Sequence, residues 1–278
     1  MKSVLMIGQS NMAGRGFMDE VPMICNERIL MLRNGRWQIM IEPINYDRPV
    51  AGVGLAGSFA SMWCMENEEE KIGLIPCAEG GSSLDDWAID GTLFKHAVSQ
   101  SQFAMQDSEL LCILWHQGEN DSRDGNYRTY YKKLRVIVEA LRNQLNAKEV
   151  PFVVGGLGDF LGKTGFGINC TEYGLINNEL LKFATEQPNV YFVTADGLTS
   201  NPDGIHIDAA SQRKFGVRYY EAFSRRRNVR KPMENEVELL DKCINRTYTK
   251  DEKIYLAMMD FALNRVTYEE LMAKMEQL

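Results

Sequence analysis

Short apolar runs rich in β-branched residues alternate along the chain with longer stretches whose apolar residues recur at helical spacing. The apolar runs predict six strands, at residues 3–7, 28–32, 72–77, 110–116, 151–155 and 190–194. The longer stretches predict five helices, at residues 58–68, 93–106, 127–145, 173–186 and 209–227. Strands that alternate with helices are joined by crossover connections, so the pattern predicts a mostly parallel sheet covered by helices on both faces.

Two parts of the chain depart from this alternation. Asn34-Gly35 lies between two apolar runs and is a hairpin signal, which predicts one small antiparallel excursion. Near the C-terminus no strand pattern recurs, and Thr249 and Thr267 are each followed three residues later by Glu, a pattern typical of helix starts. We therefore expect a main domain at residues 1–232 and a helical extension at residues 233–278. The extension can bury its apolar faces against the main domain or across a homodimer.

Composition and charge narrow the class of protein. The 278 residues are 45% hydrophobic and 25% charged, as in ordinary globular chains, and the net charge of −7 argues against a nucleic-acid partner. No apolar run approaches the ~20 residues of a membrane helix, and the N-terminal run is too short for a signal peptide. The expected location is the cytoplasm. The six scattered cysteines form no C-x-x-C pair, so neither a disulfide framework nor a metal site is expected.

Residues 52–57 match the G-x-G-x-x-G fingerprint of dinucleotide-binding proteins letter for letter. That site requires a strand immediately before the glycines, and residues 46–49 contain no strand pattern. We interpret the segment as a glycine-rich entry into the helix that follows.

Polar segments follow several of the predicted strands where the chain turns. Residues 8–14, 79–83 and 116–121 come directly after three of them, and residues 203–206 precede the last main helix. Ligands of open α/β sheets bind at the carboxyl ends of the strands, so we expect these segments to converge on one cleft.

The four segments together contain the groups needed for acyl transfer. Ser10 lies at a strand-to-helix turn, where a nucleophilic hydroxyl can be exposed. His206 is the base candidate, because imidazole titrates near neutral pH, and Asp203 can orient it. Taken alone, a serine at a turn is usually only a turn residue, and Asp208 is expected to cap the next helix. The ordered set, and no single member, carries the prediction.

An acyl-transfer enzyme also needs donors for the oxyanion of its tetrahedral intermediate. The backbone amides of Ser10 and Gly81 are candidates, together with the side-chain amide of Gln117 or of Asn120.

The ordered segments resemble the SGNH (GDSL-like) hydrolase superfamily. Within it they are similar to the carbohydrate esterases that include sialate O-acetylesterases and the acetylxylan esterases of carbohydrate esterase family six. The resemblance spans roughly residues 1–225 and depends on these segments: Gly8-Gln9-Ser10-Asn11-Met12-Ala13-Gly14, Gly80-Gly81-Ser82-Ser83, Trp115-His116-Gln117-Gly118-Glu119-Asn120-Asp121 and Asp203-Gly204-Ile205-His206.

This resemblance implies a three-layer α/β/α, flavodoxin-like parallel sheet and a serine acyl-enzyme that uses no metal and no cofactor. In the carbohydrate branch the side-chain oxyanion donor corresponds to Gln117, which we favour, whereas the general G-x-N-D pattern of the superfamily points to Asn120. Four further residues are expected to support the catalytic groups or to bind substrate: Gln9, Asn11, Arg15 and Glu119.

The expected function is removal of O-acetyl groups from a small acetylated sugar or oligosaccharide, of the xylo-oligosaccharide or sialic acid type, through an acetyl-serine intermediate. A general short-chain esterase or thioesterase, and an inactive carbohydrate-binding protein on this fold, are the alternatives. Trp87, Trp115 and Phe166 could stack on a sugar, although packing in the core is the commoner role of each.

Overall fold

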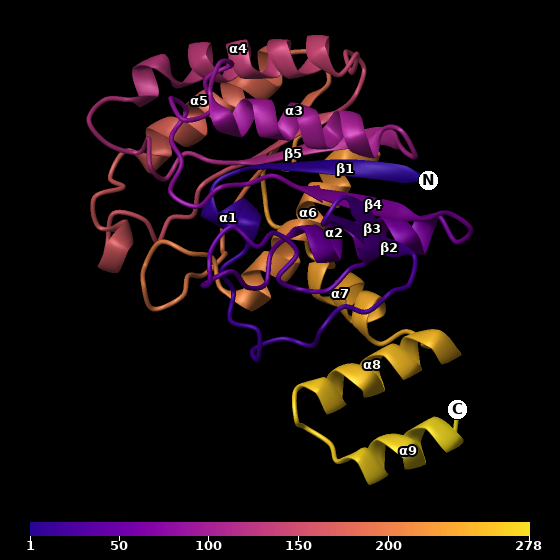
Figure 1. The fold of residues 1–278 in the computed structure, drawn as a ribbon. Coiled ribbons are helices and arrows are strands. Elements are labelled where there is room, and N and C mark those ends of the chain that lie inside the picture. Colours follow the sequence, from indigo (N-terminus) through magenta and orange to yellow (C-terminus); the bar gives the residue numbers. More distant parts are fainter.

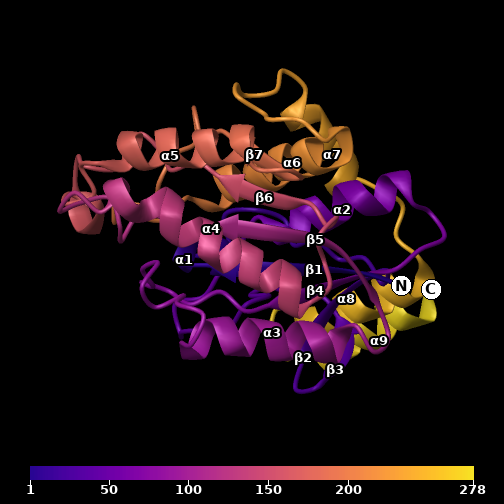
Figure 2. The same ribbon diagram turned by 90° about the horizontal axis from the view of Figure 1, so that it is seen from above.

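The computed structural model describes residues 1–278 and has the predicted three-layer α/β/α architecture (Figures 1 and 2). Its sheet has seven strands in the order β3-β2-β4-β1-β5-β6-β7. Only β3 is antiparallel, and it pairs with β2 across the predicted Asn34-Gly35 turn. The strands are β1 (Lys2–Gly8), β2 (Ile29–Arg33), β3 (Arg36–Ile39), β4 (Ile72–Pro76), β5 (Glu109–His116), β6 (Phe152–Gly155) and β7 (Val190–Val193).

Helices cover both faces of the sheet, with α3, α4 and α5 on one face and α2 and α6 on the other (Figure 1). The five predicted main helices are present, each with ends within two residues of those expected. The helices are α1 (Ser10–Ala13), α2 (Ala56–Glu66), α3 (Thr92–Ala104), α4 (Tyr127–Gln144), α5 (Tyr173–Glu186), α6 (Ala209–Arg225), α7 (Glu236–Ile244), α8 (Lys250–Ala262) and α9 (Tyr268–Glu276), with a short 3₁₀ turn, η1, at Gly165–Gly167.

The sheet separates two hydrophobic cores. Along β1, Val4 and Met6 belong to the core beneath α2 and α6, whereas Leu5 and Ile7 belong to the core beneath α3, α4 and α5. Successive side chains of a strand point to opposite faces, so a strand that is covered on both sides is apolar throughout. This explains why β1 appears in the sequence as a continuous apolar run.

The strand order places the site. The chain leaves β1, forms β2, β3 and β4 on one side of it, and then crosses to β5 on the other side. The carboxyl end of β1 therefore lies where the direction of winding changes, which is the usual ligand position in open α/β sheets. In Figure 1, α1 lies at this end of β1, opposite the N-terminus.

The G-x-G-x-x-G segment leads into α2, which begins at Ala56, as interpreted from the sequence. The amide of Gly52 donates to the Gly14 carbonyl, and Gly16 and Val53 exchange two backbone hydrogen bonds. A Cβ atom on Gly52 would lie 2.2 Å from the Gly16 carbonyl oxygen. This glycine is therefore required by backbone packing after α1.

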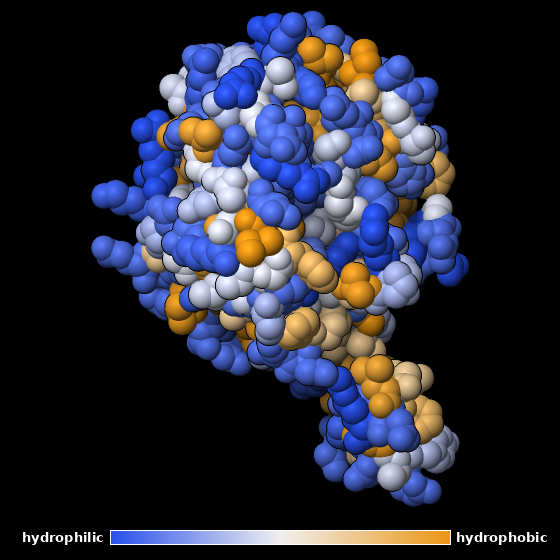
Figure 3. All heavy atoms as spheres, turned by 90° about the vertical axis from the view of Figure 1, so that its left-hand side faces the viewer, coloured by the Kyte–Doolittle hydropathy of each residue, from blue (hydrophilic) through white to orange (hydrophobic).

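The C-terminal helices differ in how they contact the body. Helix α7 packs on α6 and α2, and Glu236 forms a buried bidentate ion pair with Arg218, at 2.7 and 2.8 Å. Helices α8 and α9 project from the body (Figures 1 and 3) and begin with the predicted capping boxes at Thr249 and Thr267. None of the helices combines the length and apolar character needed to cross a membrane.

We expect Glu236→Ala to lower the free energy of unfolding by about 3–5 kcal/mol, because it leaves Arg218 buried without its carboxylate. Chemical denaturation measures this loss. The matched control is Glu238→Ala, which removes only an exposed ion pair with Lys242 on the same helix and should change little. A chain that ends after Tyr248 keeps the Arg218 pair and should lose less stability than Glu236→Ala does. Equal losses in Glu236→Ala and Glu238→Ala would contradict this account of α7.

Candidate active site

Asp203 and His206 form a closely hydrogen-bonded pair in the loop between β7 and α6. The imidazole Nδ1 lies 2.7 Å from Asp203 Oδ2, and Asp203 Oδ1 accepts the backbone amides of Ile205 and His206 at 3.1 and 3.0 Å. Partial burial acts to raise the pKa of Asp203, but these hydrogen bonds from His206 and Ile205 outweigh it and hold the pKa below its usual value. Asp208 then caps α6 through the Ser211 amide, as predicted, which fixes the end of the loop.

Ser10 lies opposite this pair. It follows β1 directly as the first residue of α1, where its backbone amide has no partner within the helix. Ser10 and His206 line the same cavity of about 310 Å³, together with Gly81 and Asn120. No hydrogen bond joins the Ser10 hydroxyl to the imidazole in this structure. Hydrogen bonds of this kind are often long in ligand-free enzymes and shorten when substrate binds.

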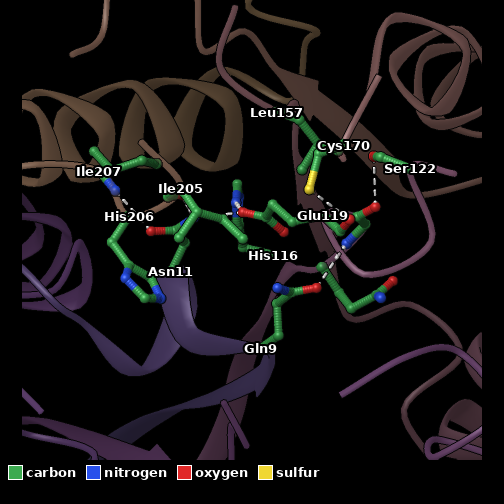
Figure 4. A network of polar contacts seen from close by, with 12 residues as sticks. Gln9, Asn11, His116, Glu119, Ser122, Leu157, Cys170, Ile205, His206 and Ile207 are labelled. Atoms are coloured by element: carbon green, nitrogen blue, oxygen red, sulfur yellow. Dashed lines mark hydrogen bonds and ion pairs between the residues drawn. The ribbon is translucent and has the colours of Figure 1, made fainter. Parts of the chain in front are cut away.

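Asn11 connects the segment of Ser10 to the loop of His206 (Figure 4). Its Nδ2 donates to the Ile205 carbonyl at 3.1 Å, and its Oδ1 accepts the Ile207 amide at 2.9 Å. The residues on both sides of His206 are thereby bonded to the residue that follows Ser10. Asn11 is buried, as a positioning residue would be.

Glu119 lies behind Asn11 and is 1% exposed. Its Oε1 accepts the Asn11 amide at 2.5 Å and lies 3.0 Å from His116 Nε2 (Figure 4). Burial acts to raise the pKa of Glu119, but the charge and hydrogen bond of His116 and the hydrogen bond from Asn11 lower it below its usual value. Glu119 is therefore a buried carboxylate that orients the Asn11 amide.

Gln9 holds the turn after β5. Its Oε1 accepts the backbone amides of Gly118 and Asn120, at 3.2 and 3.4 Å (Figure 4). Asn120 reaches the cavity from this turn, and its Nδ2 donates one hydrogen to the Gly81 carbonyl at 2.8 Å. The second hydrogen of this amide has no partner within the protein.

Arg15 positions the Gly80-Gly81 loop through Asp47. Its guanidinium forms a buried bidentate pair with Asp47, at 3.0 and 2.6 Å, and Asp47 Oδ2 also accepts the Gly80 amide at 2.8 Å. Gly81 has a φ of +79°, a conformation that favours glycine. Gly81, a candidate oxyanion donor, is thus held in place through Arg15, which lies just after α1, the helix that begins with Ser10.

The two side chains expected as alternative oxyanion donors, Gln117 and Asn120, lie in different surroundings. Gln117 is fully buried and does not line the cavity. Its two amide hydrogens are donated to the Ser82 carbonyl at 3.1 Å and to Asp121 Oδ2 at 2.5 Å. Both amide hydrogens of Gln117 are therefore already used inside the protein, whereas Asn120 lines the cavity.

Several residues that line the cavity were not among the predicted catalytic or supporting residues. Arg48 and Arg123 bring two guanidinium groups to the cavity, and their side chains are 54% and 48% exposed. Phe166 lies at its edge with 78% of the residue exposed. Cys170 also lines it, and burial raises the pKa of its thiol to about 11. Phe166 was named from the sequence as a possible stacking residue. The other three lie in loops without periodic patterns, so no sequence signal marks them.

The other two aromatic candidates are core residues. Trp87 and Trp115 are both buried and pack edge-to-face, with ring centroids 5.5 Å apart. Of the three proposed stacking residues, only Phe166 is available to a ligand.

Comparisons with known proteins agree with this geometry. The family model for carbohydrate esterases described as sialic acid-specific acetylesterases matches residues 1–225. The probable carbohydrate esterase At4g34215 of Arabidopsis thaliana is 28% identical over 244 residues, which cover 79% of this chain and 88% of the plant protein.

Solved structures show the same fold. The crystal structure of the Arabidopsis protein superposes with a TM-score of 0.72 at 25% identity, over 81% of this chain and 98% of that one. NanS superposes with a TM-score of 0.67 at 17% identity, over 81% and 96%. Because the family model covers most of the chain and includes all four polar segments, the protein belongs to the sialic acid-specific acetylesterase family of carbohydrate esterases and is a carboxylic-ester hydrolase.

Proposed function

We propose that the protein removes acetyl groups from a sugar through an acetyl-serine intermediate formed on Ser10. The observation that carries this proposal is a single cavity lined by Ser10, His206, Gly81 and Asn120. Within it, His206 is hydrogen-bonded to Asp203. Membership of an esterase family favours an active enzyme over an inactive sugar-binding protein, and its carbohydrate substrates favour a sugar esterase over a general short-chain esterase.

In the first half of the reaction, the Ser10 oxygen attacks the acetyl carbonyl carbon while Nε2 of His206 accepts the hydroxyl proton. Asp203, bonded to Nδ1, holds the ring orientation and stabilises the imidazolium. The tetrahedral intermediate collapses when the sugar oxygen leaves with the proton from His206, and Ser10 is left acetylated. In the second half, the water oxygen attacks the acetyl-serine carbonyl while His206 accepts one proton from the water. The second tetrahedral intermediate collapses when the Ser10 oxygen leaves with that proton from His206, which restores the serine hydroxyl and releases acetic acid, ionised to acetate at neutral pH.

The choice of Ser10 over Cys170 as nucleophile follows from their protonation chemistry. A cysteine reacts as the thiolate, and a pKa of about 11 keeps Cys170 protonated at neutral pH. Its Sγ also donates to the Glu119 carbonyl at 3.2 Å. A serine needs only an adjacent general base, which His206 supplies.

Ser10→Ala should reduce kcat by several orders of magnitude, leaving at most the ~10³–10⁴-fold acceleration over water that binding and oxyanion donors supply. Hydrolysis of p-nitrophenyl acetate and intact-mass labelling by a serine-directed phosphonate measure the loss. Ser99→Ala, an exposed serine on α3, is the control and should keep both activity and labelling. Full activity in Ser10→Ala would overturn the mechanism.

We assign the oxyanion to the backbone amides of Ser10 and Gly81 and to the free N–H of Asn120. Asn120→Ala should therefore lower kcat by about 10²–10³-fold with little change in melting temperature. Gln117→Ala should instead lower the melting temperature, because it removes the buried hydrogen bonds that the Gln117 side chain donates to the Ser82 carbonyl and to Asp121. Kinetics and thermal unfolding of both variants distinguish the roles. A loss of turnover confined to Gln117→Ala would restore Gln117 as the donor.

Arg48 and Arg123 favour an acidic sugar, of the sialic acid type, over an uncharged xylo-oligosaccharide. Both guanidinium groups line the cavity, and guanidinium is well matched to a carboxylate. Phe166 adds an exposed ring against which an apolar face of the sugar can pack.

We expect kcat/KM for O-acetylated sialic acid to exceed that for acetylated xylotriose by about tenfold or more, the range of a hydrogen bond to a charged group. Arg123→Gln should reduce this ratio, whereas Arg135→Gln, an exposed arginine on α4 outside the cavity, should preserve it. A preference for xylotriose, or an unchanged ratio in Arg123→Gln, would reject the acidic substrate.

We retain residues 1–232 as the proposed catalytic domain, because every residue assigned here to the reaction lies within them. In the extension, α8 and α9 leave Met258, Phe261 and Leu263 exposed, and a homodimer would cover such side chains. The chain that ends after Tyr248 keeps α7 and lacks α8 and α9. Its esterase activity tests whether these two helices are dispensable for the reaction, and its mass in solution tests whether a homodimer needs them.

A further inference from the structure

A second cavity, of about 570 Å³, lies beside the catalytic one at the carboxyl ends of β2 and β4. It is bounded by the Asn34-Gly35 turn, by residues 44–47 and 76–79, and by α3, and we call it the hairpin cavity. Its volume falls within the ~300–1,000 Å³ typical of small-molecule sites. None of the groups assigned to the acyl-transfer chemistry itself lines it.

The hairpin cavity shares a wall with the catalytic cavity. Asp47 and Glu79 line the hairpin cavity, and the next residue of each segment, Arg48 and Gly80, lines the catalytic cavity. An exposed ion pair between Arg48 and Glu79, at 3.2 Å, bridges the two sides. A ligand that extends from the catalytic cavity across this pair enters the hairpin cavity.

Tyr46 is presented to the hairpin cavity on a fixed piece of backbone. Before it, Asn45 exchanges two hydrogen bonds with the backbone of Ala78, at 2.8 and 3.0 Å. After it, Asp47 is locked by Arg15. The residue between these two anchors is nevertheless 66% exposed. A large aromatic side chain that is held rigidly at the surface costs little entropy when it binds a ligand.

The remaining polar groups of the hairpin cavity suit hydroxyl ligands. The Asn34 amide, the His96 imidazole and the Glu79 carboxylate can donate to or accept from hydroxyl groups. Both carboxylates that line it already pair with arginines, Asp47 with Arg15 and Glu79 with Arg48. Arg33 also lines the cavity and donates to the Pro43 carbonyl at 2.7 Å. An aromatic ring surrounded by such groups fits the apolar face and polar edge of a pyranose.

We propose that the hairpin cavity is a second carbohydrate subsite, which holds an uncharged sugar unit attached to the acetylated sugar in the catalytic cavity. This inference rests on the proposed sugar-esterase function and adds to it that the preferred substrate is an oligosaccharide, with Tyr46 as the stacking residue.

The test compares matched substrates that differ in length. The full-length protein is assayed with O-acetylated sialyllactose against O-acetylated sialic acid, and with acetylated xylotriose against acetylated xylose. We expect kcat/KM to favour the longer member of at least one pair. In Tyr46→Ala the ratio of long to short substrate should fall about 3–10-fold, as expected for loss of an aromatic contact. The control Phe103→Ala, an exposed aromatic on α3 outside the cavity, should preserve the ratio.

A binding measurement separates the subsite from the reaction. Unacetylated sialyllactose and xylotriose are titrated calorimetrically into the Ser10→Ala protein, with and without Tyr46→Ala. Binding that weakens about 3–10-fold with Tyr46→Ala supports the subsite even if no acetyl ester is hydrolysed, in which case only the proposed function fails. Equal ratios in both substrate pairs, together with binding that Tyr46→Ala does not change, would overturn the subsite while leaving the esterase intact.

Discussion

The side-chain amide of Asn11 is the contact on which the geometry of the reaction depends. Ser10 and His206 lie far apart in the sequence, Ser10 after β1 and His206 after β7. The folding of the sheet brings their loops together. Asn11 then bonds to the backbone on each side of His206, while Glu119 fixes the orientation of its amide. These groups are buried, so breaking any one bond leaves a donor or acceptor without water or protein to satisfy it. That cost holds Ser10 and His206, the proposed nucleophile and base, at a defined separation.

The same short segment organises the rest of the site. Of the polar residues around Ser10, Gln9 holds the turn after β5, Asn11 holds the loop before α6, and Arg15 holds the loop after β4 through Asp47. Each of these supporting side chains reaches a different loop, and the three loops deliver Asn120, His206 and Gly81. Rigid support of this kind is what electrostatic stabilisation of an oxyanion requires, because donors that are already oriented need not reorganise during the reaction.

The alternation of apolar runs with helical stretches, and the polar segments that follow the runs, made the fold and the approximate position of the cleft predictable, since a buried strand is apolar and parallel strands end at one edge. The choice between Gln117 and Asn120 was not predictable in this way. Gly118, with a φ of +147°, turns the backbone between them, so that Gln117 stays in the interior and Asn120 reaches the cavity. Arg48 and Tyr46 were also missed, because they lie in a loop whose conformation depends on distant partners, Ala78 for Asn45 and Arg15 for Asp47.

The exposed ion pair between Arg48 and Glu79 lies between the two cavities, and breaking it requires little free energy. An exposed ion pair contributes roughly 0–1 kcal/mol, so Arg48 can leave Glu79 for a substrate carboxylate without a large loss. Glu79 is then released to accept a hydroxyl hydrogen in the hairpin cavity. A substrate with an acidic unit followed by an uncharged one would bond to both Arg48 and Glu79. A single acidic sugar would bond only to Arg48, and Glu79 would then be hydrogen-bonded to water. If the two proposed subsites are used as assigned, this ion pair links binding of a carboxylate in one cavity to binding of hydroxyl groups in the other.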